Sequence, residues 1–179
     1  MRENEEAYNI FVSERVSWMG SVAVVEVESL QGDVIPSPKI KVLKLHPAAQ
    51  LPKYAHTGAY GDLAADVYAV EGATITAGAT VAVPTGIAME FPSTHGALVE
   101  DRSGLAVRGV TTLAGVIDPG YRGELKIVVT NLSAATVEVK AGERIAQLRI
   151  VQRIEAQFEE VAELAEAARG AAGFGSTGA

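Results

Sequence analysis

Four short polar clusters carry residue types that bind and hydrolyse phosphorylated ligands. Each lies in a turn between β-like stretches, where a rigid scaffold usually presents its functional residues. Carboxylates there could accept a proton or hold a hydrated metal ion, and arginines with free backbone N–H groups could seat phosphates. The clusters are GDLAADVYA at 61–69, DRSGLA at 101–106, AGVIDPGYRGELK at 114–126 and GERIAQLRI at 142–150.

The first two clusters offer a metal site and a phosphate site. Asp66 follows two alanines and precedes a strand, so backbone can approach a ligand or a hydrated metal there. An Asp in this place is more often a plain turn former. Ser103 and Gly104 could open a short helix whose first N–H groups, with Arg102 beside them, seat a phosphate. The alternative is Ser103 as an ordinary N-cap and Arg102 in a surface ion pair.

The other two clusters offer a base and a ligand contact. Asp118 ends an apolar run, so we expect a dry environment that tunes its basicity, and Tyr121 is close enough to line the same pocket. The same residues also fit a simple Asp-Pro-Gly turn. Gln147 is a polar residue inside an apolar strand, which favours a ligand or partner contact because an unpaired buried amide is costly.

The C-terminal stretch RGAAGFGSTGA at 169–179 permits two interpretations. Its glycines and small residues are typical of a disordered tail. Phe174 between glycines, with Arg169 before it and Ser176 and Thr177 after it, would equally suit a lid that closes on phosphates.

Short alternating stretches must position these clusters. They recur along the chain between turns rich in Gly, Pro, Asn and Ser, which predicts an all-β sandwich or barrel without strand–helix alternation. Helix is expected at most as one turn over 103–107, and 159–169 combines helix formers with a turn-rich context. The predicted strands lie in KIKVLKL, DVYAVE, ATVAVPTG, GIAMEF, GELKIVVTN, ATVEVK and ERIAQLRIV.

Bulk properties narrow the classes of function. The chain has 179 residues, a formal net charge of −7 with scattered basic residues, and no cysteine. A nucleic-acid-binding face needs clustered positive charge, so we expect no nucleic-acid partner. No apolar stretch approaches the roughly 18 residues of a membrane span, and the acidic N-terminus is unlike a signal peptide, so we expect a cytoplasmic protein without a membrane partner.

The composition shifts near residue 38 and predicts three parts. Residues 1–37 are expected to form an N-terminal extension that is partly disordered or adds an edge strand through SVAVVEVES, and a later translation start, for example at Met19, stays open. Residues 38–168 form a β domain, and 169–179 form a flexible arm that closes over the active site.

In order and spacing, the clusters resemble the motifs of the trimeric dUTP pyrophosphatases (dUTPases). The match runs from about Ile40 to Gly178, with AGVIDPGYRGE, GERIAQL and RGAAGFGSTG closest to the third, fourth and fifth motifs. The resemblance implies a jelly-roll-like β subunit, a homotrimer whose sites draw motifs from different subunits, and Mg²⁺-assisted hydrolysis of dUTP to dUMP and pyrophosphate. That reaction removes dUTP and supplies the dTTP precursor.

The resemblance also implies a role for each site residue. Asp118 would orient and deprotonate the attacking water, Tyr121 would pack under the deoxyribose and exclude a 2′-hydroxyl, and Asp66 would hold Mg²⁺ through water. A narrow hairpin over 110–121 would read uracil through backbone groups. The remaining substrate-binding residues would be Arg102, Ser103, Gly104, Gly115, Gln147, Arg169, Phe174, Gly175, Ser176 and Thr177.

The sequence departs from the family's pattern in three places. Leu63 and Ala64 stand where the first motif usually has Ala-Gly, Asp101 stands where the second usually begins with Pro, and TTL replaces a stretch that often holds an Asn before AGVID. An extra carboxylate at 101 would weaken phosphate binding unless it faces Arg102 or the metal. Without that Asn, base contacts must come from backbone.

Two other functions stay open on the same scaffold. A dCTP deaminase, possibly bifunctional, shares the Asp-Pro-Gly turn and an aromatic residue, but Val128 stands where that family places its deaminating Glu. A non-catalytic trimeric dUTP-binding or regulatory protein would use the N-terminal extension as its interaction surface.

Overall fold

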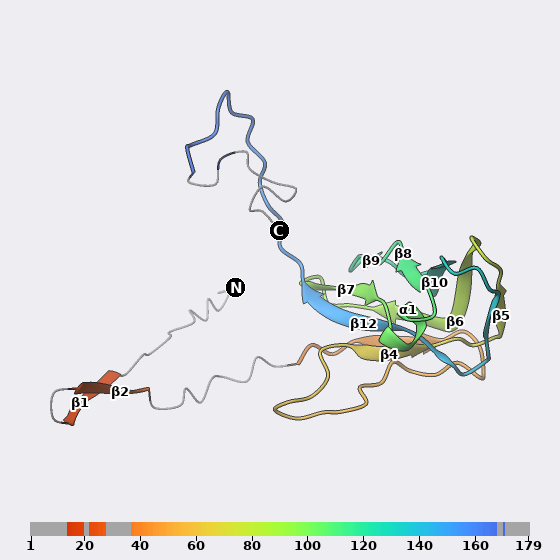
Figure 1. Cartoon of the computed structure of the whole chain (residues 1–179), viewed down its shortest axis with the longest axis horizontal. Coiled ribbons are helices and arrows are strands. Elements are labelled where there is room, and N and C mark those ends of the chain that lie inside the picture. The colour runs from red at the N-terminus through yellow and green to blue at the C-terminus, as the bar shows by residue number, and fades with distance from the viewer. Residues whose placement is uncertain (1–13, 20–21, 28–36, 168–169, 171–179) are drawn as a thin grey trace, which may run out of the picture.

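Two four-stranded antiparallel sheets contain most of the strand residues that the structure describes (Figure 1). The chain is described by a computed structural model, which covers residues 14–19, 22–27, 37–167 and 170. Among these residues the one helix is the single turn α1, Ser103–Ala106. The predicted all-β class and the short helix are therefore confirmed.

The two large sheets contain the strands that carry the polar clusters. The first has the order β3-β6-β10-β8, with β3 Lys41–Lys44, β6 Thr80–Glu90, β10 Glu124–Asn131 and β8 Val110–Leu113. The second has the order β4-β12-β7-β9, with β4 Ala65–Tyr68, β12 Arg144–Gln152, β7 His95–Glu100 and β9 Val116–Ile117.

Two smaller sheets complete the described strands. β5 Ala73–Ile75 pairs with β11 Val137–Val139. β1 Glu14–Met19 and β2 Val22–Val27 pair with each other in a two-stranded sheet of their own. The expected strand in SVAVVEVES thus exists, and β1 is its partner.

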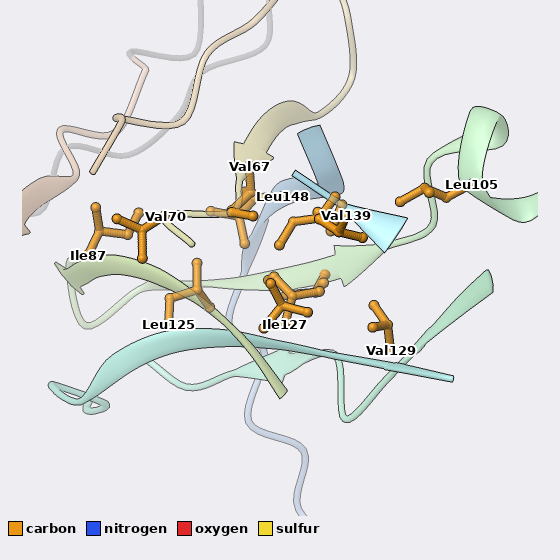
Figure 2. Close-up of a cluster of buried hydrophobic side chains, with 14 of the residues drawn as sticks. Val67, Val70, Ile87, Leu105, Leu125, Ile127, Val129, Val139 and Leu148 are labelled. Atoms are coloured by element: carbon orange, nitrogen blue, oxygen red, sulfur yellow. The ribbon is translucent and has the colours of Figure 1, made fainter. Parts of the chain in front are cut away.

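The core lies between the inward faces of the two large sheets. In β10 every second side chain is buried, which is the period-two pattern expected of a strand with one face inward. Leu125, Ile127 and Val129 on β10 pack in one apolar cluster with Val67 on β4 and Leu148 on β12 (Figure 2). Each such fully buried side chain stabilises the fold by about 1.5–3 kcal/mol relative to an exposed one.

The prediction of two strands separated by a Pro-Thr-Gly turn was wrong, because β6 runs through this segment as one 11-residue strand. The partner strand β10 shifts its register between Glu124 and Lys126, which bends the pair without ending it. Gly86 has a φ of +67°, and its N–H donates to Oε1 of Glu124 at 2.9 Å. The glycine accommodates a bulge rather than a turn.

The predicted hairpin over residues 110–121 was also wrong. β8 pairs with β10 in the first sheet, whereas β9 pairs with β7 in the second. The chain therefore crosses from one sheet to the other between Leu113 and Val116.

The described part of the C-terminal segment is not helical. Residues 159–167, with their helix-forming alanines and glutamates, adopt neither helix nor strand. No helix that the structure describes is both long enough and apolar enough to span a membrane.

Candidate active site

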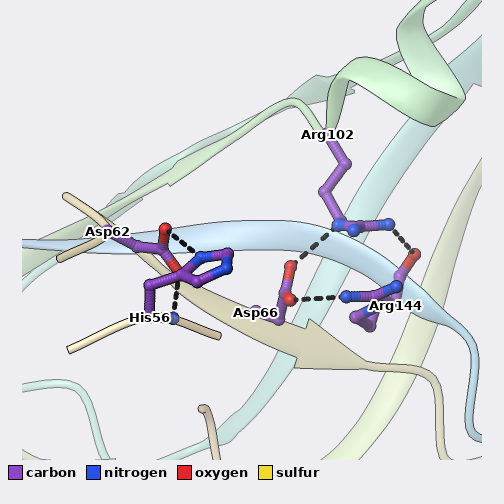
Figure 3. Close-up of polar contacts among 5 residues, drawn as sticks. All are labelled: His56, Asp62, Asp66, Arg102 and Arg144. Atoms are coloured by element: carbon purple, nitrogen blue, oxygen red, sulfur yellow. Dashed lines mark hydrogen bonds and ion pairs between the residues drawn. The ribbon is translucent and has the colours of Figure 1, made fainter. Parts of the chain in front are cut away.

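Asp66 forms ion pairs with two arginines from distant parts of the chain (Figure 3). Its Oδ1 accepts from Nε of Arg102 at 2.8 Å, and its Oδ2 accepts from Nη1 of Arg144 at 3.2 Å. The Asp66 side chain is only 9% exposed, and that of Arg102 is 22% exposed. Such charge-assisted hydrogen bonds in partly dry surroundings hold both guanidinium groups in fixed places.

Three elements bring these residues together. Asp66 lies on β4, opposite Gln147 of β12 in register, and Arg144 begins β12. Arg102 occupies the extended N-cap position of α1 and makes no side-chain cap bond. Asp66, Arg102, Arg144 and Gln147 line one hollow of about 330 Å³, here called the arginine hollow.

The turn-former alternative for Asp66 and the N-cap alternative for Ser103 are both wrong. Asp66 is buried inside a strand, and Arg102 rather than Ser103 occupies the N-cap. Ser103 and Gly104 are exposed at the start of α1, and their N–H groups have no partner within the described chain. The phosphate-binding role expected for these two residues stays a prediction.

The donor set of the arginine hollow fits a Mg²⁺ ion held mostly by a ligand. Both Asp66 oxygens already accept from guanidinium groups, so direct ligation would compete with two ion pairs. A carboxylate oxygen has a further lone pair that can accept from a metal-bound water, and protein-bound Mg²⁺ often keeps several waters beside substrate phosphates. No cluster of three or more His, Asp or Glu side chains that could hold a metal occurs in the described residues.

The sequence analysis missed a His–Asp pair on the rim of the arginine hollow. Oδ2 of Asp62 accepts from the His56 backbone N–H at 2.8 Å, and Oδ1 lies 3.1 Å from Nδ1 of the His56 ring (Figure 3). The backbone hydrogen bond, and then the ring contact, hold the pKa of Asp62 below its ordinary value. Arg144 was missed as well, although it lies inside the GERIAQLRI cluster. His56 lies outside all four clusters, and no sequence pattern marked it as a site residue.

Asp118 and Tyr121 line a second hollow of about 440 Å³, here called the tyrosine hollow. Its other lining residues come from the sheet crossover and the start of β10: Ala114, Val116, Ile117, Glu124, Leu125 and Lys126. Asp118 is exposed in the single chain, so the dry environment expected for it is not found there.

The Tyr121 side chain is held by its neighbours in the turn. Its hydroxyl donates to the backbone carbonyl of Glu124 at 2.9 Å. A Cβ added at Gly123 would lie 2.5 Å from that hydroxyl and 2.7 Å from Cζ, so Gly123 leaves the space that the ring occupies. The Tyr121 N–H donates to the Asp118 carbonyl at 3.1 Å and closes the Asp-Pro-Gly turn.

The sheet crossover beside this hollow has an unusual backbone. Ala114 has a φ of +52° and is the one non-glycine residue in the left-handed region among those described. Gly115 follows; its carbonyl accepts from the Val99 N–H at 2.7 Å, and a Cβ there would lie 2.6 Å from the Val99 carbonyl oxygen. Gly115 is thus required for close packing against β7, and the strained Ala114 is of the kind that gathers at functional sites.

The sequence-predicted site residues that line a hollow fall into two groups, whereas Ser103, Gly104 and Gly115 line neither hollow. The arginine hollow and the tyrosine hollow have no lining residue in common. Arg169, Phe174, Gly175, Ser176 and Thr177 lie outside the described residues, so their predicted roles stay predictions.

Comparison with known proteins assigns the family. The dUTPase family profile matches residues 50–178, which includes both hollows. The chain belongs to the dUTPase family. It is 42% identical over 165 residues to a deoxyuridine 5′-triphosphate nucleotidohydrolase of Thermobifida fusca, covering 89% of this chain and 88% of the relative. The enzyme of that name from Solibacter usitatus is 43% identical over 148 residues, covering 81% of this chain and 99% of the relative.

Solved dUTPase structures share the fold. A dUTPase of Staphylococcus bacteriophage 80alpha, solved with dUpNHpp, has a TM-score of 0.71 at 24% identity, covering 79% of this chain and 99% of that one. A dUTPase of the S. aureus phage phi11, whose structure concerns coordination of a structural Mg(II) ion, has a TM-score of 0.64 at 22% identity, covering 72% and 99%. The predicted dUTPase-like jelly-roll fold is confirmed.

Proposed function

We propose that this dUTPase-family protein hydrolyses dUTP to dUMP and pyrophosphate. The observation that carries the proposal is the pairing of Asp118 with a restrained Tyr121 in one hollow, while Asp66 fixes two arginines in another. Together these groups provide a base, a nucleoside platform and positive charge for a triphosphate. Cleavage of a phosphoanhydride requires little beyond such positioning and charge neutralisation.

Asp118 acts as the general base. Its carboxylate orients a water molecule toward the scissile phosphate and accepts that water's proton as the new P–O bond forms. The carboxylate lies at the end of β9, next to Val116 and Ile117, with one side open in the single chain. Closure by further protein segments would exclude bulk water from this open side.

Tyr121 and the sheet crossover select the nucleoside. The ring, held through its hydroxyl and by the space at Gly123, packs under the deoxyribose and leaves no room for a 2′-hydroxyl. The N–H and C=O of Ala114 have no hydrogen-bond partner within the described chain. Backbone groups that pair with O4 and N3–H of uracil would be left unpaired by cytosine, which favours dUTP strongly.

The arginine hollow and α1 bind the phosphates. Arg102 and Gln147 contact phosphate oxygens, and Ser103 and Gly104 donate their free N–H groups near the scissile link. Arg144, fixed by the same carboxylate as Arg102, adds a second positive charge. Asp66 would hold a Mg²⁺ ion through water, and that ion would neutralise charge on the phosphate oxygens.

The C-terminal arm completes the site. Phe174 stacks on the uracil, and Gly175 supplies a close backbone approach to the ligand. Arg169, Ser176 and Thr177 grip the outer phosphates. In this proposal residues 169–179 are a closing arm, 38–168 the β domain and 1–37 an extension.

The active unit is a homotrimer in the cytoplasm. In one chain, the predicted base and the predicted phosphate contacts line two different hollows. This separation supports a site that combines the tyrosine hollow of one subunit with the arginine hollow of another. A closed ring of three identical chains would bring each tyrosine hollow against a neighbour's arginine hollow.

The two alternative functions have less support. Val128, which stands where a deaminase places its Glu, does not line the tyrosine hollow. A purely regulatory binding protein has no need of a carboxylate free to take a proton at Asp118.

Pyrophosphate release tests the proposal. Purified protein with Mg²⁺ should release pyrophosphate from dUTP and much less from dCTP, dTTP or UTP. Asp118→Asn should abolish release while dUTP binding persists. Ammonia release from dCTP would favour the deaminase, and tight dUTP binding by a wild-type protein without turnover would favour the regulatory protein.

A further inference from the structure

Asp101 turns its carboxylate away from the arginine hollow and toward the edge of β8. Its Oδ1 accepts from the backbone N–H of Thr112 at 2.6 Å and from the Thr112 hydroxyl at 2.7 Å. Its Oδ2 accepts from the Thr111 hydroxyl at 2.9 Å. One exposed carboxylate just before α1 thus binds two residues of β8 that lie 10 and 11 positions further along the chain.

The direction of this side chain bears on the expected cost of a carboxylate at position 101. That carboxylate was expected to weaken phosphate binding unless it faced Arg102 or the metal, and it takes a third direction while Arg102 pairs with Asp66. Asp101 does not line the arginine hollow. Its charge is directed at three donors on β8, so it weakens phosphate binding far less than its place in the sequence suggests.

The contact fills a vacant hydrogen-bonding edge. β8 is the last strand of its sheet, and its other side pairs with β10. An edge strand presents N–H groups with no strand partner, and the carboxylate takes the one at Thr112. Burial alone would raise the pKa of Asp101, but the hydrogen bonds from Thr112 and Thr111 outweigh it and hold the pKa below its ordinary value.

The anchored strand leads directly into the nucleoside side of the site. Ala114, two residues after Thr112, has the left-handed backbone and lines the tyrosine hollow. A shift of β8 at its free edge would move Ala114 and the segment up to Asp118. The two departures from the family's pattern, Asp101 for Pro and Thr112 within the stretch that often holds an Asn, therefore contact each other.

We propose that Asp101 is a positioning residue for nucleoside selection, acting through Thr112 to hold the Ala114 crossover in place. This inference rests on the proposed dUTP hydrolysis. Because Asp101 accepts from both the hydroxyl and the N–H of Thr112, neither donor is free to pair with the base. Discrimination between uracil and cytosine then depends on how firmly the crossover backbone is held.

Steady-state kinetics on Asp101→Ala test the inference. We expect the KM for dUTP to rise about tenfold, with a much smaller change in kcat, and the kcat/KM preference for dUTP over dCTP to fall. Asp101→Asn, whose Oδ1 still accepts from the Thr112 N–H, should recover part of the loss. Thr112→Val should have a smaller effect, and the double variant should be no worse than Asp101→Ala.

Glu138→Ala is the matched control. Glu138 is also a carboxylate that accepts a threonine hydroxyl across two strands, from Thr74 at 2.7 Å, but it lies on β11. The Glu138→Ala variant should leave the KM for dUTP and the preference for dUTP over dCTP unchanged. If Asp101→Ala behaves like Glu138→Ala, or lowers kcat and stability without changing KM or base preference, the inference is wrong.

Hydrogen exchange separates this inference from the proposed activity. The Thr112 amide should be protected in the wild type and should exchange faster in Asp101→Ala, whether or not the protein hydrolyses dUTP. A wild type that does not hydrolyse dUTP would overturn the proposed function. A wild type that is active, beside an Asp101→Ala variant with unchanged Thr112 exchange, would overturn the positioning role.

Discussion

Nε of Arg102 and Oδ1 of Asp66 lie 2.8 Å apart, although 36 residues separate them in the chain. The same carboxylate binds Arg144 from a third segment. One buried acidic group therefore organises the positive charge that the proposed triphosphate meets. The consequence is that Asp66 matters to phosphate binding even where it touches no phosphate.

Replacing Asp66 by Asn should destabilise the protein and weaken dUTP binding. Two guanidinium groups lose their shared charge partner, and Arg102 is largely withdrawn from water. We expect a loss of about 1–3 kcal/mol, less than for a fully buried pair because Arg144 is half exposed. Chemical denaturation measures the loss, and the KM for dUTP should rise together with it.

Glu90→Gln is the control for this variant. Glu90 pairs with Lys41 at 2.7 Å, but both side chains are well exposed. Breaking such a solvent-screened surface pair should change stability little. Equal losses in the two variants would mean that the Asp66 ion pairs have no special structural role.

Gly123→Ala should impair selection of the sugar. Its Cβ would meet the hydroxyl end of Tyr121, which can swing aside, so stability should change little while the ring leaves its place. We expect about a tenfold rise in the KM for dUTP and weaker rejection of UTP. Gly120→Ala, whose added Cβ would meet no atom within 4 Å beyond its chain neighbours, should change neither the KM for dUTP nor the rejection of UTP. A shared response of both variants to UTP would argue against the platform role of Tyr121.

The Asp101 contact should make stability depend on pH in the acid range. The pKa of Asp101 is lower in the folded protein than its ordinary value of 3.8. The contact therefore contributes its full stability above pH 3.8 and loses it as the pH falls through the lower, folded value. The difference in unfolding free energy between wild type and Asp101→Asn should shrink below pH 3.8. A difference that grows there would contradict the assigned contact.

Removing residues 170–179 should separate folding from catalysis. The described core ends with β12 at Gln152, and no residue of the apolar cluster lies beyond it. The shortened chain should melt near the wild-type temperature, retain its oligomeric state and lose nearly all pyrophosphate release. Substantial activity in the shortened chain would exclude the arm from the site.

The sequence predicted those features that depend on local patterns. Period-two alternation in GELKIVVTN and ERIAQLRIV identified β10 and β12, because one inward face per strand leaves that signature. The motif resemblance identified Asp118 and Tyr121, and the structure brings both to one hollow.

Features that depend on distant partners could not be predicted from the sequence. Arg144 and Asp66 are 78 residues apart, and nothing local marks their ion pair. The Pro84–Gly86 segment has the composition of a turn, yet the bulge opposite Glu124 carries β6 through it. Asp101 was read beside its sequence neighbour Arg102, whereas its partners lie on β8.

A mixture of two inactive chains tests the shared dUTP site most directly. Asp118→Asn removes the base from the tyrosine hollow, and Arg102→Ala removes a phosphate contact from the arginine hollow. Co-expressed with different tags and purified through both, the mixed oligomers should release pyrophosphate from dUTP. In a closed ring of three chains that contains both variants, one junction joins an intact Asp118 to an intact Arg102, so about a third of the sites are intact. Inactive mixed oligomers, beside an active doubly tagged wild type, would contradict a site shared between chains.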